Sequence, residues 1–271
     1  MTVATLAVEK IRHPLKARLL QVRRTRQLTP HLLRVTLAGD DLADFVSGSF
    51  DDHVKLLLPP TPDDVPALPA TGPRGLAFPD GAERPVARDY TPRRYDPDAR
   101  ELDVDFVLHG HGPAATWAAQ ARPGQSVGIA GPRGSFVIPT EFDWHLLVGD
   151  ETAIPAIGRR LEELPARKRV LAVVEISSPA AQVDFETRAD LAIQWVHCPI
   201  DTSDGASALE RAVRRLHLPD GNGYIWAAGE FSAIRDIRHH LVHERGFDKA
   251  RIRAASYWRR DAGQGHEVFD D

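Results

Sequence analysis

The sequence predicts a two-domain protein, in which an N-terminal antiparallel β-barrel of residues 1–140 is followed by an α/β domain of residues 141–271 with a parallel sheet. Two observations carry this prediction. Before residue 140, short segments rich in β-forming residues are separated by Pro and Gly turns, as in barrels. After residue 143, short apolar strands alternate with segments whose apolar residues recur at helical spacing, as in βαβ units.

Strands dominate the first domain. The clearest one alternates the apolar residues Leu102, Val104, Phe106 and Leu108 with Asp103, Asp105 and Val107. Further strands are predicted at 32–39, 53–58 and 126–130. The segment 59–85 is rich in proline and glycine, so we expect it to be a long loop.

Strands and helices alternate in the second domain. Strands are predicted at 144–148, 169–175, 193–197 and 224–228. Helices are predicted from apolar residues at helical spacing: one with Ile154, Ile157, Leu161 and Leu164, one at 206–216, and one with Ile234, Ile237 and Leu241 that Ser232 caps and Gly246 ends.

The composition excludes several classes of protein. The 34 Lys and Arg residues against 38 Asp and Glu give a net charge of −4, so neither a nucleic-acid-binding nor a basic membrane-surface protein is expected. The single Cys198 cannot build a disulfide, a Cys-rich zinc site or a four-thiolate iron–sulfur cluster, and is expected to be buried. Apolar runs are too short for membrane insertion and no secretory signal is visible, so we expect a cytoplasmic monomer.

A cation, an aromatic ring and a hydroxyl occur close together in Arg88, Tyr90 and Thr91. Side chains two residues apart on a strand share a face, so Arg88 and Tyr90 would point the same way. An arginine for a phosphate and an aromatic face for a flat ring suit a flavin nucleotide. A solvated edge strand is the alternative interpretation.

The segment Gly110–Ala115 has the spacing G-x-G-x-x-A at the start of a short helix. A Rossmann site would also need an acidic residue at the end of the next parallel strand, and this helix stops early at Pro123. The N–H groups of Gly112–Thr116 can still bind an anion such as a pyrophosphate, or the segment is a plain turn. His109 and His111 have no further ligands nearby and are not expected to bind a metal.

Two strand–helix junctions of the second domain, Gly149–Ala153 and Ala228–Glu230, are expected at the carboxyl edge of the parallel sheet. Ligands bind at this edge in α/β folds, and ordinary turns are the alternative. Three histidines, His239, His240 and His243, crowd a later helix away from its apolar residues and are expected to be solvated.

Eight segments taken in order carry a resemblance to a known family: Leu28–Thr36, Asp52–Leu56, Arg88–Arg93, Asp105–Gly110, Gly112–Ala118, Gly149–Ala153, Ala228–Glu230 and Tyr257–Arg260. Together they resemble the siderophore-interacting proteins, FAD-dependent ferric-siderophore reductases related to ferredoxin–NADP reductases. The resemblance extends over nearly the whole chain.

The resemblance implies FAD as the cofactor and NADH or NADPH as the electron donor. Arg88 would hold the FAD phosphates, Tyr90 would stack on the isoalloxazine ring, and Thr91 would hydrogen-bond near its reactive edge, with no other catalytic group. Further FAD contacts would come from Asp105, Val107, His109, Gly112, Pro113, Ala114, Ala115 and Thr116. On the nucleotide side the cofactor-binding residues would be Gly149, Asp150, Glu151, Thr152, Gly229, Glu230, Tyr257 and Trp258. An anionic ferric siderophore would meet Lys55, Arg133, Arg259 and Arg260.

The resemblance also implies the reaction. Hydride passes from the nicotinamide to the flavin, single electrons pass to siderophore-bound Fe(III), and Fe(II) is released in the cytosol. Two alternatives stay open: a reductase that serves a free flavin, a haem or an electron-carrier protein, and a non-catalytic siderophore-binding protein. The nucleotide also stays open, because Glu175 suits a ribose hydroxyl whereas Ser177 and Ser178 suit a 2′-phosphate.

Overall fold

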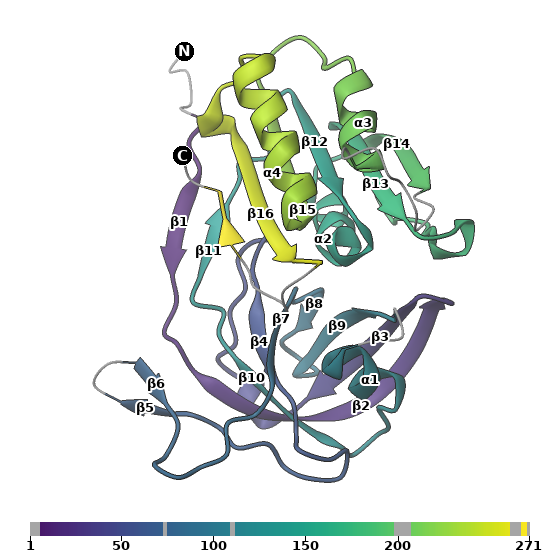
Figure 1. The fold of residues 1–271 in the computed structure, drawn as a ribbon. Coiled ribbons are helices and arrows are strands. Elements are labelled where there is room, and N and C mark those ends of the chain that lie inside the picture. Colours follow the sequence, from purple (N-terminus) through teal and green to yellow (C-terminus); the bar gives the residue numbers. More distant parts are fainter. Residues whose placement is uncertain (1–5, 73–74, 109–111, 198–206, 261–266, 270–271) are drawn as a thin grey trace. The chain divides into compact units, whose positions relative to one another are not determined.

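The computed structural model describes residues 6–72, 75–108, 112–197, 207–260 and 267–269. These residues form two compact units, one of Ala7–Ile138 and the other beginning at Pro139 (Figure 1). Cys198, which is predicted to be buried, lies outside the described residues. The same holds for His109 and His111, which are predicted not to bind a metal.

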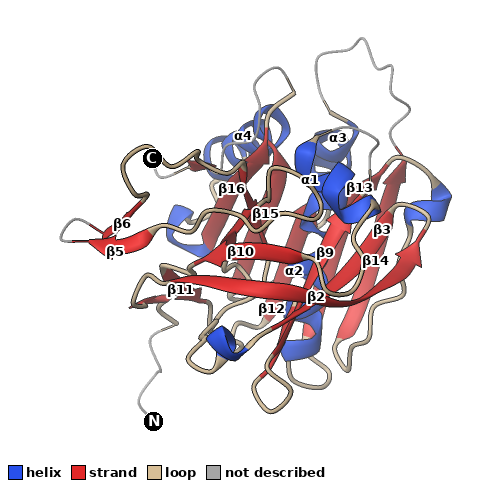
Figure 2. Ribbon diagram, turned by 90° about the horizontal axis from the view of Figure 1, so that it is seen from below, coloured by secondary structure: helices blue, strands red, loops and turns tan. Residues whose placement is uncertain are grey.

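The first unit is built on a seven-stranded sheet in which every neighbouring pair is antiparallel. In spatial order its strands are β7 (Ala87–Tyr90), β4 (Val54–Leu57), β10 (Ser126–Ala130), β2 (Ala17–Thr29), β3 (Leu32–Ala38), β9 (Glu101–Val107) and β8 (Arg94–Asp96). The long strand β2 pairs with both β10 and β3 and crosses the unit in Figure 2. The sequence reading did not predict β2, because its second half is rich in exposed arginines.

The alternation on β9 explains why this sheet closes around a core. Leu102, Val104 and Phe106 are fully buried and pack with residues of β2, β3 and β10. The helix α1 (Pro113–Ala119) adds Trp117 and Ala118 to the same core. The predicted β-barrel domain is therefore confirmed.

Three residues, Thr91–Arg93, join the two outermost strands of the sheet, β7 and β8. We call Thr91–Arg93 the barrel seam. The Tyr90 ring on β7 lies 4.5 Å from the Phe106 ring on β9, between ring centroids. The edge strand β7 therefore approaches β9, the neighbour of the opposite edge strand β8. Arg88 and Tyr90 thus lie directly before the barrel seam, and Thr91 is its first residue.

Shorter elements complete this unit. Strand β1 (Glu9–Arg12) pairs with β11 (Gly134–Val137), and the 3₁₀-helix η1 spans Asp40–Leu42. Strands β5 (Ala70–Gly72) and β6 (Gly75–Ala77) pair with each other. The prediction of one unbroken loop at 59–85 was therefore wrong, because it contains this short hairpin.

The second unit is built on a six-stranded sheet. In spatial order its strands are β14 (Asp190–His197), β13 (Arg169–Ile176), β12 (Trp144–Gly149), β15 (Gly223–Glu230), β16 (Ile252–Trp258) and β17 (Glu267–Val268). All pairs are parallel except β16 with β17. This confirms the predicted α/β domain with a parallel sheet.

Helices cover both faces of this sheet. Helices α3 (Ala208–Arg215) and α4 (Phe231–His239) pack on one face, whereas α2 (Ile154–Glu163) lies behind the sheet in Figure 1. Short helical turns are η2 (Glu151–Ala153), η3 (Pro179–Ala181) and η5 (Lys249–Arg251), and a π-helix, η4 (His240–Glu244), extends α4. In the part of the chain that the structure describes, no helix is long and apolar enough to cross a membrane.

The cap of α4 differs from the sequence prediction. The Glu230 carboxylate accepts hydrogen bonds from the backbone N–H groups of Ser232, at 2.8 Å, and Ala233, at 3.1 Å. Ser232 therefore lies inside the helix, and the prediction that Ser232 caps α4 was wrong. A carboxylate at a helix start is favourable because it faces unpaired N–H groups and the positive end of the helix dipole.

Candidate functional site

The Arg88–Tyr90 segment forms strand β7, as the shared-face argument required. Arg88 pairs in register with Leu56 of β4 and Tyr90 with Val54. The half-buried Arg88 guanidinium donates a 2.8 Å hydrogen bond to the carbonyl of Ala87. Among the described residues no carboxylate pairs with it, so its charge is available to an anionic group.

An aromatic series leads from β7 into the core. The Tyr90 ring tilts by 39° against Phe106, and Phe106 lies 5.7 Å from Trp117 on α1, between ring centroids. Burial raises the pKa of Tyr90 well above its usual value, and the positive charge of Arg88 only partly opposes this. Tyr90 therefore presents a neutral ring at physiological pH, and Thr91 beside it is buried.

Helix α1 begins at Pro113, and the N-cap before it is Gly112, whose φ of 97° favours glycine. Pro113 occupies the first turn and no side chain caps the start, so backbone N–H groups of the first turn remain without a side-chain acceptor. Ala114 and Ala115 are buried against the core. Of the residues predicted to contact FAD, Gly112–Thr116 lie at the start of this helix. His109 lies outside the described residues.

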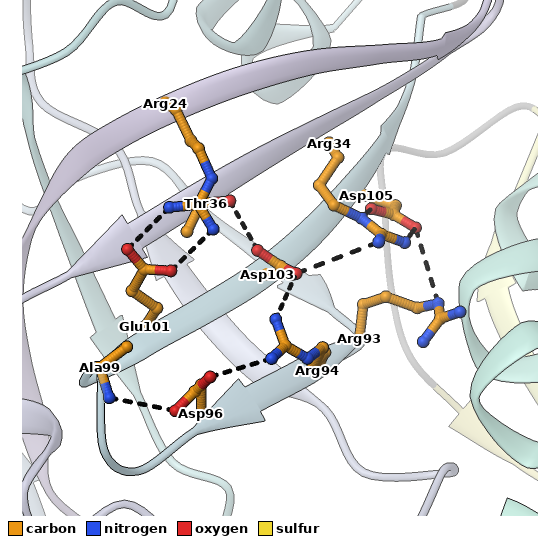
Figure 3. Close-up of polar contacts among 10 residues, drawn as sticks. All are labelled: Arg24, Arg34, Thr36, Arg93, Arg94, Asp96, Ala99, Glu101, Asp103 and Asp105. Atoms are coloured by element: carbon orange, nitrogen blue, oxygen red, sulfur yellow. Dashed lines mark hydrogen bonds and ion pairs between the residues drawn. The ribbon is translucent and has the colours of Figure 1, made fainter. Parts of the chain in front are cut away.

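The outer face of β9 carries a row of acids that sequence reasoning did not connect with their partners (Figure 3). Arg34 donates to both oxygens of the buried Asp105, at 2.6 and 2.8 Å, and Arg93 of the seam lies 3.8 Å from it. Asp103 accepts a 2.6 Å hydrogen bond from the Thr36 hydroxyl. The Asp105 carboxylate is therefore used inside the protein, and only backbone groups of Asp105 and the half-buried Val107 are left for a ligand.

The four predicted siderophore-binding cations differ in their surroundings. The Lys55 ammonium lies 2.9 and 3.0 Å from the two carboxylate oxygens of Asp89, its partner in register on β7. Arg133 is exposed and has no carboxylate partner among the described residues. The Arg259 guanidinium lies 3.6 Å from the Phe231 ring centroid, and Arg260 is exposed.

Asp150 connects three strand ends at the carboxyl edge of the parallel sheet. Its Oδ1 accepts hydrogen bonds from the N–H and hydroxyl of Thr152, at 2.9 and 2.5 Å. Its Oδ2 accepts from the N–H of Glu230, at 2.9 Å, and from the indole N–H of Trp258, at 2.8 Å. Burial raises the pKa of Asp150, and these four donors act in the opposite direction. The predicted residues Asp150, Thr152, Glu230 and Trp258 are thus brought together.

Two glycines allow this close approach. A Cβ on Gly149 would lie 2.3 Å from the Cβ of Ala153, and one on Gly229 would lie 2.6 Å from Oδ2 of Asp150. Gly229 also has a φ of 154°. Both positions therefore require glycine for the three strand ends to meet.

The remaining acids of this edge are also engaged. Glu151 accepts from the N–H and hydroxyl of Ser177, at 2.5 and 2.6 Å, and Glu175 accepts from the N–H of Leu209 near the start of α3, at 2.8 Å. Burial raises the pKa of Glu175. Glu175 and Ser177, which the sequence offered for a ribose hydroxyl and a 2′-phosphate, both have protein partners. Tyr257 is half-buried, with its ring 6.3 Å from that of Trp226.

Comparisons with known proteins agree with this geometry. The family described as the siderophore-interacting FAD-binding domain matches residues 21–136, and the family described as siderophore-interacting protein matches residues 142–261. An NADPH-dependent ferric-chelate reductase of Escherichia coli K12 is 35% identical over 92% of this chain and 96% of its own length. A ferric vibriobactin reductase of Vibrio cholerae serotype O1 is 32% identical over 94% of this chain and 93% of its own. The crystal structure of a siderophore utilization protein from T. fusca is 38% identical, covers 96% of this chain and 98% of its own, and superposes with a TM-score of 0.85.

Proposed function

We propose that this chain, which belongs to the siderophore-interacting protein family, is an FAD-dependent ferric-siderophore reductase. It takes hydride from NADH or NADPH and passes single electrons to Fe(III) held by a siderophore, and the more weakly held Fe(II) is released. The E. coli and V. cholerae relatives, named as reductases of ferric chelates and of ferric vibriobactin, support this assignment. The E. coli relative makes NADPH the first nucleotide to test.

The observation that carries the proposal is the grouping of Arg88 and Tyr90 on β7. A half-buried guanidinium without a carboxylate partner among the described residues lies on a strand beside an aromatic ring packed on Phe106. A bidentate cation suits a phosphate, and an aromatic face suits a flat ring, so these residues fit FAD. Bound FAD would supply the conversion between a two-electron nicotinamide donor and a one-electron iron acceptor.

The protein groups around FAD would bind and orient it. Arg88 would pair with its phosphates, Tyr90 would stack on its ring, and the Thr91 hydroxyl would hydrogen-bond near the reactive edge. The N–H groups of Gly112, Ala114 and Ala115 would hold the pyrophosphate, because no side chain caps the start of α1. Pro113 has no N–H, and the N–H of Thr116 donates to the carbonyl of Gly112 at 3.0 Å. Ala115 would contribute only its backbone N–H to this site.

We assign FAD to the domain of residues 1–140 and the nicotinamide nucleotide to the domain of residues 141–271. The carboxyl edge of the parallel sheet supports the second assignment, because nucleotides bind there in α/β folds. Gly149, Gly229 and the hydrogen bonds of Asp150 shape this edge. Tyr257 and Trp258 end β16 at the same edge.

For the anionic siderophore we propose Arg133, Arg259 and Arg260 as the main cations, with a smaller contribution from Lys55. Asp89 already compensates the charge of Lys55. Exposed charge pairs contribute only about 0.2–1 kcal/mol each, so each cation alone would change siderophore binding only modestly.

We further propose that the protein acts in the cytoplasm, as a monomer and without nucleic acid. Nicotinamide nucleotides are available as donors there, and a single cysteine, Cys198, is in keeping with a reducing compartment. The net charge of −4 does not favour binding to nucleic acid.

Anaerobic stopped-flow mixing tests the proposal. Purified protein is mixed with NADPH or NADH while flavin absorbance is followed, and a ferric siderophore, ferric citrate, free flavin or a haem is then added. We expect bleaching by a nicotinamide nucleotide and recovery with formation of Fe(II) on adding the ferric siderophore. Recovery with the other acceptors but not with siderophores, or a protein that purifies without flavin, would refute the assignment.

A further inference from the structure

A pair of histidines lies on the surface of the α/β unit where α4 continues into the π-helix η4. The wider turn of η4 is closed by a 3.0 Å hydrogen bond from the N–H of Arg245 to the carbonyl of His240. Ile237 and Leu241 on the inner side are fully buried. His239 and His243, four residues apart, are both exposed.

The two exposed imidazoles face each other. Their ring centroids are 4.8 Å apart and the ring planes are inclined by 39°. Within the described part of the chain, neither ring has a hydrogen-bond or ion-pair partner. Both rings are therefore free to use a nitrogen lone pair on a ligand.

The third histidine of this segment behaves differently. His240 is buried, which corrects the prediction that all three histidines are solvated. Its Nδ1 lies 3.0 Å from Nη1 of Arg214 and 2.9 Å from a carboxylate oxygen of Glu244. His240 therefore belongs to a link between α3 and the end of α4, and only His239 and His243 remain accessible.

Two histidines at i and i+4 on a helix are the spacing that zinc-binding helices use, because one metal ion can reach both rings. Neutral imidazole suits borderline divalent ions such as Cu²⁺, Ni²⁺ and Zn²⁺. Among the described residues, no group of three or more His, Cys, Asp or Glu side chains could hold a metal. The protein would thus provide two ligands and water the others.

We propose that His239 and His243 form a surface clamp for a divalent transition-metal ion. Neither histidine is among the residues proposed above for FAD, the nicotinamide nucleotide or the siderophore. Arg235, one turn before His239, would oppose a cation, but its guanidinium is paired with Asp236 at 2.8 Å. Exposure means that the ion keeps most of its hydration shell, so binding involves little desolvation.

The affinity should follow the usual order of divalent ions, with Cu²⁺ bound most tightly and Mn²⁺ most weakly. Once one imidazole holds the ion, the second contact is intramolecular. Loss of either histidine should therefore weaken binding by about 100-fold or more. A site with one histidine would lose affinity in only one of the two variants.

Calorimetric titration of the full-length, flavin-loaded protein with CuCl₂ or NiCl₂ tests the proposal. The variants are His239→Gln and His243→Gln, and the matched control is His217→Gln, which removes another exposed histidine after α3. We expect the affinity for one equivalent of ion to fall by that factor in either variant and to be unchanged in the control. Electron paramagnetic resonance of bound Cu²⁺ should show coupling to two imidazole nitrogens.

Three results would overturn the clamp: unchanged affinity in both variants, loss in only one of them, or equal loss in the His217→Gln control. Circular dichroism and urea unfolding verify that each variant is folded. Ferric-siderophore reduction, measured without added metal, should be unchanged in His239→Gln and His243→Gln. This comparison separates failure of the clamp from failure of the proposed reductase function.

Discussion

Replacing Asp150 by Asn changes one atom of the group that connects β12, β15 and β16. The native carboxylate faces four donors, two on each oxygen. An Asn amide has one acceptor oxygen and one NH₂ group. Whichever way it turns, at least one native backbone donor faces another donor.

The size of the effect follows from these contacts. A hydrogen bond to a charged acceptor contributes about 1.5–3 kcal/mol, so loss of the two on Oδ2, from Glu230 and Trp258, would cost about 3–6 kcal/mol. Burial, which raises the pKa of Asp150, acts the other way, because a neutral amide is easier to bury than a carboxylate. We expect a net loss of about 2–3 kcal/mol in the free energy of unfolding, or about 4–12 °C in Tm.

Thermal and urea unfolding of Asp150→Asn measure this loss. The matched control is Asp143→Asn, because the exposed Asp143 accepts one N–H among the described residues, from Asn222 at 2.6 Å. A double-mutant cycle with Trp258→Phe isolates the indole hydrogen bond and should give a coupling energy of about 1–2 kcal/mol. An Asp150→Asn protein that melts within about 2 °C of the native one would refute the reasoning.

Three further predictions concern other parts of the molecule. Tyr90→Ala should purify without flavin, because the aromatic face is lost; a yellow protein with an unshifted absorption spectrum would contradict that role. Arg133→Ala should raise KM for a ferric siderophore at low salt by about 2- to 5-fold. Lys55→Ala should raise KM by less, because Asp89 already pairs with the Lys55 charge. Equal effects of the two variants in steady-state assays would argue against this ranking. The pKa of Glu244 is lowered from its usual 4.5 to about 2, mainly by the hydrogen bond from Arg214. The stabilising contribution of Glu244 is therefore complete above pH 4.5 and is lost as the pH falls toward 2. The Tm difference between the native protein and Glu244→Gln should therefore shrink below pH 4.5, and a difference independent of pH would count against it.

The sequence predicted the elements whose hydrophobic pattern is local. The alternation of Leu102, Val104 and Phe106 identified β9, and the apolar runs at 144–148 and 224–228 identified two parallel strands. The two sheets confirm the predicted two-domain fold. The family matches confirm the resemblance to siderophore-interacting proteins.

Partners that depend on tertiary register could not be read from the chain. Asp105 meets Arg34 because β3 and β9 pair in a particular register, and Lys55 meets Asp89 for the same reason on β4 and β7. Strand β2 was missed because only part of it faces the core. The cap of α4 was misplaced because Glu230 and Ser232 both suit a helix start, and only the backbone path decides between them.

The shortness of the barrel seam has a consequence for how the first unit folds. The outermost strands of the sheet follow one another along the chain, so bringing them together closes only a tiny loop and sacrifices little chain entropy. The pairing of β2 with β10, by contrast, joins the beginning and the end of the unit. We therefore expect the pairing of β2 with β10 to form more slowly than the contacts around the barrel seam, because a long loop must close first.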